Sequence, residues 1–508
     1  MPSDRRLHPL SILFGLVAQV RNFLLPGFVV LFAGSQGWWG DWQRWAMLLV
    51  IPYAFVAILR YVTFRYRYEA HEMVIRTGLL FRNERHVPYA RIQNLDAVQN
   101  VFHRLLGVVE VRVQTGGGQE PEAKMSVLPV AEYEEMRRRV FEGKAGEEAP
   151  ADAEAPPAAA PGRTLLRLSL PELLLCGFIE NRGVVLIATG FGLIWELGLG
   201  NTLMERIFGG EVSGRSMIRD LFRSLLGQTG FPLGRIALTL AAFAGLLLFI
   251  RLISMVWAFT RLYGFRITRA GEDLRTEYGL LTRVVATVPL RRIQTLTIRE
   301  GPLHQLFRRA SVKVQTAGGG GEGGEEDAGA KQREWLAPII RQEALPDFLR
   351  EVLPEVELAA VSWRPVEPRA FRRVLKQSVL MSILFSLPFV VPLKAWALVP
   401  LAVFLVWGTI SSRIYVRNLG WAVTESAVLF RSGWIWRQVS VARFAKIQAV
   451  AIHESPFDRR SAMARVRVDT AGAGMTAHRV DIPYLARETA RDLYSLLARQ
   501  AAHTAFRW

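Results

Sequence analysis

A pattern of three residues recurs three times along this 508-residue chain, each time after a pair of long apolar segments. It consists of a glycine that opens a turn, a glutamine 15 residues later and a threonine a further 22 residues on, with identical spacings in every copy. Its members are Gly78, Gln93 and Thr115; Gly279, Gln294 and Thr316; and Gly433, Gln448 and Thr470. Fixed spacing with free variation between the fixed points indicates one supersecondary unit used three times. The sequence therefore predicts three copies of a membrane-anchored module.

The composition is that of a chain that is part membrane and part water-facing. Hydrophobic residues make up 51% of it and charged residues still make up 21%. The net charge of +18 comes mainly from arginine and points to an anionic partner. Because many arginines lie beside the apolar segments, the expected partner is the lipid bilayer and not nucleic acid. The lone cysteine, Cys176, excludes an intramolecular disulfide and a cysteine-rich metal site.

Six apolar segments approach the length of about 20 residues that a bilayer-spanning helix needs. They form three pairs, at about 23–37 and 45–63, 183–199 and 236–259, and 378–392 and 396–414. A proline (Pro9, Pro171 or Pro368) opens a lead-in to each pair, which predicts a helix lying at the membrane interface. Arginine and lysine gather at the span ends that adjoin the modules. The positive-inside rule therefore predicts that both termini and all three modules are cytoplasmic.

The second span pair carries an additional loop, at about 201–233. In it Arg215, Arg219 and Arg223 recur every fourth residue opposite an apolar face, which predicts an amphipathic helix. Two locations remain open for this helix, on the neighbouring spans or on lipid headgroups. Residues 143–163, rich in alanine, proline and acidic residues, are expected to form a disordered linker.

The segment that ends at each threonine alternates apolar and polar residues, as in residues 109–114, 312–315 and 466–469. Such alternation predicts half-buried strands of an antiparallel sheet, and each module closes with an amphipathic helix. The predicted fold is thus an α+β membrane protein with six transmembrane helices in three pairs, each pair followed by a small β-barrel or sandwich capped by a C-terminal helix. The expected divisions are 1–64 (interfacial helix and first span pair), 65–142 (module 1), 143–163 (linker), 164–262 (second pair with its loop), 263–353 (module 2), 354–376 (linker and interfacial helix), 377–415 (third pair) and 416–499 (module 3).

One run of residues carries a family resemblance. Residues 100–107, followed by a valine-rich strand and by residues 114–117, resemble the bacterial membrane-flanked pleckstrin-homology (PH) domain, and residues 301–307 and 315–318 repeat the match. Because the paired spans belong to the family pattern, the resemblance covers nearly the whole chain. It implies a PH-like fold, a bacterial inner-membrane location and a role in envelope homeostasis or defence. Module 3 departs from the pattern, with Arg443 at the position of Pro88 and Asp458 at that of His103.

The repeated glutamines are candidate ligand contacts, but a glutamine near a strand start more often binds free backbone groups, so a structural role is predicted for the whole pattern. No catalytic motif, phosphate loop or metal-ligand spacing is evident, so we expect no enzyme activity, cofactor or metal. Specific phosphoinositide binding is not expected, since Glu69, Glu272 and Glu425 interrupt the basic residues of the first hairpins. Two charged residues within spans, Arg251 and Glu196, either reach the bilayer surface or line an ion path.

Apolar residues beside the family run form a candidate interaction patch, represented by Phe102 and Leu106 in module 1 and by Leu303 and Phe307 in module 2. Small modules held close together tend to bury such patches on a neighbour or a partner protein. The predicted function is therefore a non-enzymatic membrane scaffold that presents its modules to a protein or to the membrane surface. The alternative is a transporter, or a subunit of one, gated by the modules, which should bring more polar or broken helices at mid-membrane.

Overall fold

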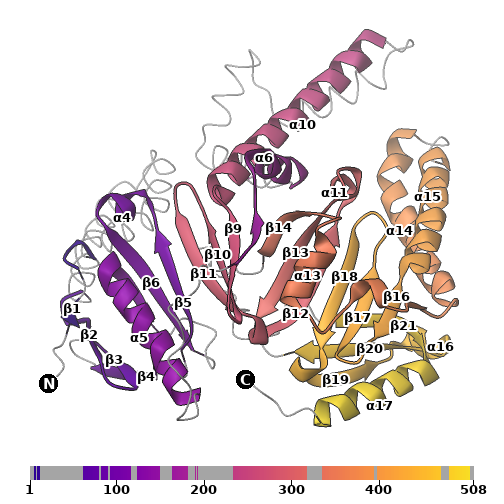
Figure 1. The fold of residues 1–508 in the computed structure, drawn as a ribbon. Helices are drawn as coiled ribbons and strands as arrows, with labels where there is room; N and C mark the ends of the chain where they lie inside the picture. Colours follow the sequence, from indigo (N-terminus) through magenta and orange to yellow (C-terminus); the bar gives the residue numbers. More distant parts are fainter. Residues whose placement is uncertain are drawn as a thin grey trace, which may run out of the picture.

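The computed structural model describes residues 5–6, 8–11, 61–78, 82–89, 92–115, 123–148, 163–180, 233–316, 335–393, 398–470 and 480–503, and the single residues Gly183, Thr189 and Gly192. Within these ranges the chain forms three modules that lie side by side in chain order (Figure 1). Each module has a first sheet of four strands, a second group of three strands and a closing helix. A short helix connects the first two strands of that second group.

The elements of module 1 are β1 (Arg5–Arg6), β2 (Arg65–Tyr68), β3 (Glu72–Thr77), β4 (Asn83–Pro88), β5 (Ile92–Gln99), α4 (Val101–Leu105), β6 (Val108–Thr115), β7 (Ala123–Pro129) and α5 (Val130–Glu148). Those of module 2 are β8 (Arg163–Arg167), α6 (Leu170–Ile179), α10 (Leu233–Leu262), β9 (Arg266–Ala270), β10 (Asp273–Tyr278), β11 (Arg283–Pro289), η2 (Leu290–Arg292), β12 (Ile293–Glu300), α11 (Pro302–Leu306), β13 (Arg309–Thr316), β14 (Trp335–Arg341) and α13 (Leu345–Val352). Those of module 3 are η3 (Leu358–Ala360), β15 (Arg364–Pro365), α14 (Ala370–Leu393), α15 (Leu398–Asn418), β16 (Gly420–Val423), β17 (Ala427–Ser432), β18 (Arg437–Arg443), η5 (Phe444–Lys446), β19 (Ile447–His453), α16 (Pro456–Arg460), β20 (Met463–Thr470), β21 (Val480–Ala486) and α17 (Arg487–His503).

Each module encloses an apolar core between its strands and its closing helix. In module 1 this core joins Tyr66 of β2, Val111 of β6 and Met136 of α5, all of them buried. Buried and half-exposed residues alternate along β10 and β11, as the apolar–polar alternation predicts for strands with one face on a core. The alternation of apolar and polar residues therefore determines which face of these strands turns inward.

The first strand of every module precedes its spans, which corrects the expected boundaries. β1 pairs with β2, β8 with β9 and β15 with β16, all antiparallel, so the segment before each span pair completes the sheet formed after it. The modules thus begin before residues 65, 263 and 416. These strands are two to five residues long and basic, and they lack the alternation that would reveal a strand in the sequence.

The linker expected at 143–163 is also corrected at both ends. Helix α5 continues to Glu148, and strand β8 begins at Arg163, where it pairs with β9. The remainder of that linker lies outside the described residues.

Three helices in the described part of the chain are long and apolar enough to cross a membrane, at Ala244–Leu262, Ala370–Val390 and Leu398–Asn418. They match the fourth, fifth and sixth expected spans. Nearly all of the first three expected spans, together with Glu196 and the amphipathic helix expected in the loop at 201–233, lies outside the described residues. In the second pair the lead-in forms a separate helix, α6, but in the third pair α14 starts at Ala370 and runs through the lead-in without a break. The helix is continuous there because no helix breaker stands between Arg369 and the apolar run.

Small and hydroxyl residues bring α6 close to α10 and α14 close to α15. A Cβ on Gly177 would meet the backbone of Met255 in α10 at 2.6 Å, and Gly183 donates its N–H to Ser254 Oγ at 2.7 Å. Between α14 and α15 the hydroxyls of Ser378 and Ser412 lie 2.8 Å apart. Small residues and hydroxyl hydrogen bonds are the usual means by which helices associate in lipid, where the hydrophobic effect between helices is absent.

Neighbouring modules are joined by strand pairing. Strand β5 of module 1 pairs with β11 of module 2 over three residue pairs, and β12 of module 2 pairs with β18 of module 3 over six. Two seven-stranded sheets result, each made of the second strand group of one module and the first sheet of the next. At the second joint Leu429 packs in the core of module 2 while its neighbour Val428 packs in that of module 3. Both faces of the sheet are therefore covered at β17, which accounts for the uninterrupted apolar residues 427–430 of that strand.

Candidate interface at the module joints

The three repeated glycines occupy turns that only glycine enters without strain. Their φ angles are +95° at Gly78, +114° at Gly279 and +84° at Gly433. A Cβ on Gly279 would lie 1.9 Å from the Thr282 oxygen, and one on Gly433 would lie 1.8 Å from the Trp436 oxygen. These positions therefore demand glycine both for backbone conformation and for space.

The repeated glutamine and threonine set the register of one hairpin. In all three modules the isoleucine before the glutamine pairs with the repeated threonine: Ile92 with Thr115, Ile293 with Thr316, and Ile447 with Thr470. The register then shifts by one, so the glutamine is the extra residue of a β-bulge each time. The constant spacing of 22 residues is thus the length of a hairpin that contains one short helix and one bulge.

The environments of the glutamine side chains differ. Gln294 is buried and its Nε2 donates to the Arg292 carbonyl at 3.4 Å, whereas Gln448 is exposed beside Tyr494 of the closing helix. The side chain of Gln93 lies outside the described residues. What these positions share is a bulge in the backbone, and the two described glutamine side chains line no common site.

Each short helix follows directly after a strand and has exposed apolar side chains. In α4, Phe102 is 66% and Leu105 81% exposed, and Leu106 directly after it is 42% exposed. In α11, Leu303 packs against the core of module 2, while Leu306 is 72% exposed. The candidate patch therefore divides: Phe102, Leu106 and Phe307 face outward and Leu303 faces inward.

The helices are capped at their first turn by the residues at repeat positions 100 and 103. Asn100 accepts the His103 N–H at 2.8 Å, His304 Nδ1 accepts the Gly301 N–H at 3.4 Å, and Asp458 accepts the Ser455 N–H at 3.2 Å. The histidine position is therefore a capping position, which explains why aspartate replaces histidine in module 3. Burial lowers the pKa of His304. Among the described residues no three His, Cys, Asp or Glu side chains are grouped to hold a metal ion.

At the first joint, the short helix of module 1 contacts the glycine turn of module 2. Arg104 of α4 donates to the Leu280 carbonyl at 3.0 Å. The same turn is bound to the module end of α10, since the Gly279 and Leu280 N–H groups donate to the Tyr263 and Thr260 carbonyls at 2.8 and 3.0 Å. Leu281, the next residue, is 56% exposed. The turn thus connects two modules and one span helix.

The second joint repeats this arrangement. Gln305 of α11 donates to the Ile435 carbonyl, in the glycine turn of module 3, at 2.9 Å. In that turn, Trp434 packs on Trp407 of α15 with 5.7 Å between ring centroids, and Trp436 is 72% exposed. Phe307 makes an edge-to-face contact with Phe178 of α6. The short helix α11 therefore lies between the glycine turn of module 3 and α6, a helix associated with the spans.

The third short helix, α16, contacts the start of a span helix directly. Arg373 of α14 lies over the ring of Phe457, and its Nε is 3.6 Å from an Asp458 carboxylate oxygen. Phe457 remains 57% exposed. The sequence did not single out Leu281, Trp436 and Phe457 as interface residues, although the apolar residues that follow the repeated glycines were a signal for the first two.

Arg251 has a structural partner. Its Nη1 donates to the Phe178 and Ile179 carbonyls at 2.7 and 3.4 Å, and its guanidinium lies over the Phe178 ring. These carbonyls belong to the last turn of α6. Carbonyl groups at a helix C-terminus have no N–H partner within the helix and carry partial negative charge. The arginine thus caps one helix from another.

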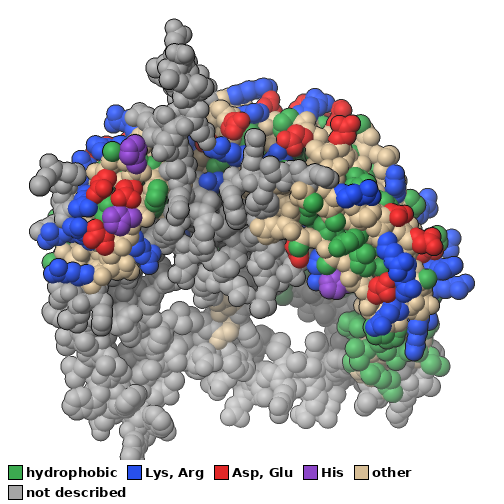
Figure 2. Space-filling model, turned by 90° about the horizontal axis from the view of Figure 1, so that it is seen from below, with side chains coloured by type: hydrophobic (Ala, Val, Ile, Leu, Met, Phe, Trp, Pro, Cys, Tyr) green, Lys and Arg blue, Asp and Glu red, His purple; other side chains and the backbone are tan. Residues whose placement is uncertain are grey.

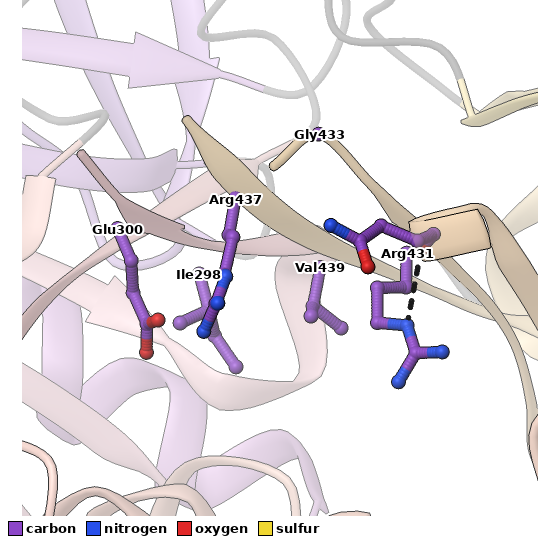
Figure 3. Close-up of a pocket in the computed structure, with 7 residues that line it drawn as sticks. Ile298, Glu300, Arg431, Gly433, Arg437 and Val439 are labelled. Atoms are coloured by element: carbon purple, nitrogen blue, oxygen red, sulfur yellow. Dashed lines mark hydrogen bonds between the residues drawn. The ribbon is translucent and has the colours of Figure 1, made fainter. Parts of the chain in front are cut away.

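A cavity of about 270 Å³ lies at the second joint, next to the end of α15 (Figure 3). Ile298 and Glu300 of β12 and Arg437 and Val439 of β18 line one side. Arg431 lines the other and donates to the Asn418 carbonyl at 3.3 Å. Two guanidinium groups against one carboxylate give the lining a net positive charge.

Positive charges also meet at the other end of the second joint. Burial lowers the pKa of Arg292 to about 10, with nearby Arg291 adding to the effect. Burial, followed by the charge of Arg443, lowers the pKa of Lys446. The ion pair from Arg443 to Glu355, at 2.7 Å, offsets part of this repulsion. The joint therefore forms despite unfavourable charge at this end, through strand pairing and apolar burial.

Comparison with known proteins identifies relatives of this chain. The family model described as the bacterial PH domain matches the chain three times, at residues 13–144, 225–352 and 382–501. The chain is 26% identical over 477 residues to the UPF0699 transmembrane protein YdbT of Bacillus subtilis (strain 168), and the alignment covers 91% of both chains. No solved structure shows a significant match.

Proposed function

Because the chain belongs to the bacterial PH domain family and carries three copies of that domain, we propose that it is a non-enzymatic membrane scaffold that holds three joined PH-like modules at the cytoplasmic face of the bacterial inner membrane. The family matches confirm the resemblance seen in residues 100–117. In this proposal the chain crosses the bilayer six times, in three pairs, and both termini are cytoplasmic. A role in envelope homeostasis or defence remains part of the proposal.

The observation that carries the proposal is the strand pairing between modules. Six residue pairs join β12 to β18, and β12 is buried along most of its length because it lies in the middle of a seven-stranded sheet. Modules on flexible linkers would move independently, whereas modules joined through backbone hydrogen bonds and a shared core keep a fixed spacing. A fixed row of three domains offers an extended surface, which suits a scaffold.

Two further observations support the proposal. Arg413 and Arg417 lie in the last turns of α15, and Arg372 and Arg373 in the first turns of α14, where the positive-inside rule places cytoplasmic residues. Arg251, which would be the charged residue of a transport path through α10, is already engaged by the carbonyls of α6. This favours the scaffold over the transporter.

The joint can be tested by disulfide formation across it. Arg299 and Gln438 are directly opposite one another in the β12–β18 ladder. In native membranes, Arg299→Cys with Gln438→Cys should form a disulfide on mild oxidation, since opposite residues of antiparallel strands lie within disulfide reach. The control is Arg299→Cys with Arg437→Cys, whose side chains face opposite sides of the sheet. Equal crosslinking of the two pairs, or none in either, would refute a joined scaffold.

A further inference from the structure

We propose that the two module joints and α16 insert apolar side chains into the lipid interface, so that the modules are fastened to the bilayer along their length as well as through the spans. The side chains are Leu105, Leu281, Leu306, Trp436 and Phe457, here called the lipid row. This inference rests on the scaffold proposal and names the lipid surface as the partner of these side chains.

The depth of the second joint follows from its contact with α15. Trp434 packs on Trp407, and Trp407 precedes Arg413 by six residues in this helix. At a rise of about 1.5 Å per residue, Trp407 lies about 9 Å nearer to the bilayer centre than Arg413 along the helix axis. An arginine at a span end stays at headgroup level. The turn that carries Trp434 therefore reaches below the headgroups, at the depth where tryptophan is enriched in membrane proteins.

The first joint is held to the end of a span in a similar way. The Leu280 N–H donates to the carbonyl of Thr260, which lies within the candidate span Ala244–Leu262. Leu281 adjoins this bond and is 56% exposed. Since Arg104 binds the same turn, the short helix α4 lies beside it with Leu105 81% exposed. Exposed apolar residues at the end of a span are placed to contact lipid.

Leu306 and Phe457, the other residues of the lipid row, are held near span ends by contacts of their short helices. Gln305 holds α11 to the turn of module 3, and Arg373, in the first turn of α14, holds α16. The side of the modules away from the spans, where the structure describes it, displays Lys, Arg, Asp and Glu side chains among hydrophobic ones (Figure 2). The exposed apolar side chains of the lipid row lie at the span ends instead, as expected for domains lying on a membrane.

A lipid-facing row can be tested with a fluorophore in nanodiscs that contain one copy of the full chain. Single cysteines at Leu105, Leu306 and Trp436 would carry an environment-sensitive dye, and Leu496→Cys is the matched control. Leu496 is an apolar residue, 39% exposed, on α17, which lies on the side away from the spans (Figure 1). The parent protein serves as the labelling blank, since its Cys176 is buried.

Spin-labelled lipid should quench the dye at the three row positions at least several-fold more strongly than at Leu496→Cys, and aqueous iodide should show the opposite order. Iodide access at the row equal to that at the control would overturn the inference and leave the surface for a protein partner. Protection from both quenchers would also overturn it, indicating a contact within or between chains. Either result can occur while the Arg299–Gln438 disulfide still forms, so failure of this inference is distinguishable from failure of the scaffold.

Discussion

The turn at Gly279 gives the sharpest test of how the repeated pattern builds a module joint. Gly279 and Gly271 bound the same hairpin strand, β10, and both have positive φ, +114° and +62°. They differ in surroundings: a Cβ on Gly271 would meet nothing within 4 Å, whereas one on Gly279 would lie 1.9 Å from a backbone oxygen. Replacing each by alanine therefore separates the conformational cost from the steric one.

The expected magnitudes follow from these differences. At Gly271 alanine can adopt the left-handed conformation at a cost of about 1 kcal/mol. At Gly279 the φ angle lies beyond that region and the turn must open. This adds the loss of two hydrogen bonds, to the carbonyls of Thr260 in α10 and of Tyr263 just after it, each worth about 1 kcal/mol. The total for Gly279→Ala is about 3–4 kcal/mol. The difference of about 2–3 kcal/mol corresponds to roughly a hundredfold in the opening equilibrium.

Hydrogen–deuterium exchange of the full chain in nanodiscs measures this opening locally. The amides of β10 and β11 should exchange roughly a hundredfold faster in Gly279→Ala than in Gly271→Ala, while those of β20 and β21 in module 3 should be unchanged in both variants. Exchange in β10 and β11 that differs less than threefold between the two variants would refute the claim that this turn requires glycine for space as well as for conformation.

Four shorter predictions follow. Gly107 and Ala462 occupy one repeat position at φ +64° and +51°, so Ala462→Gly should stabilise its module by up to about 1 kcal/mol and Gly107→Ala should destabilise its own by about as much, measured by local exchange. Burial lowers the pKa of His304 below 6.5. Between the lowered value and 6.5 the proton binds to the unfolded chain and not to the folded one, so the stability of the fold decreases as the pH decreases. His304→Asn, which keeps a hydrogen-bond acceptor, should flatten the pH dependence of thermal unfolding in this range. Arg251→Met should cost about 1.5–3 kcal/mol and speed exchange in α6, and an unchanged α6 would exclude the capping role. Asp492→Cys, exposed on α17, should resist a membrane-impermeant maleimide added outside intact cells and react after lysis, and labelling from outside would overturn the cytoplasmic orientation.

The sequence alone determined the repeated hairpin. Gly279, Gln294 and Thr316 could be recognised because turn, bulge and strand partner are local features: a turn needs a glycine at one position, and a bulge with its partner strand requires a fixed number of residues between them. Length and hydropathy likewise predicted the spans that the structure describes, since crossing a bilayer imposes a minimum apolar length. Such requirements leave a constant spacing in the chain, whatever lies around it.

Only the tertiary structure decided how the modules meet. The pairing of β12 with β18 and of β8 with β9 depends on backbone hydrogen bonds, which nearly every residue type can make, so no particular side chain marks the edge where one module ends and the next begins. Arg251 shows the same limit: its charge was visible in the sequence, but the α6 carbonyls that bind it lie more than 70 residues away and are backbone groups. Backbone groups are common to every position, and therefore only their arrangement in space distinguishes a joint or a cap from any other part of the chain.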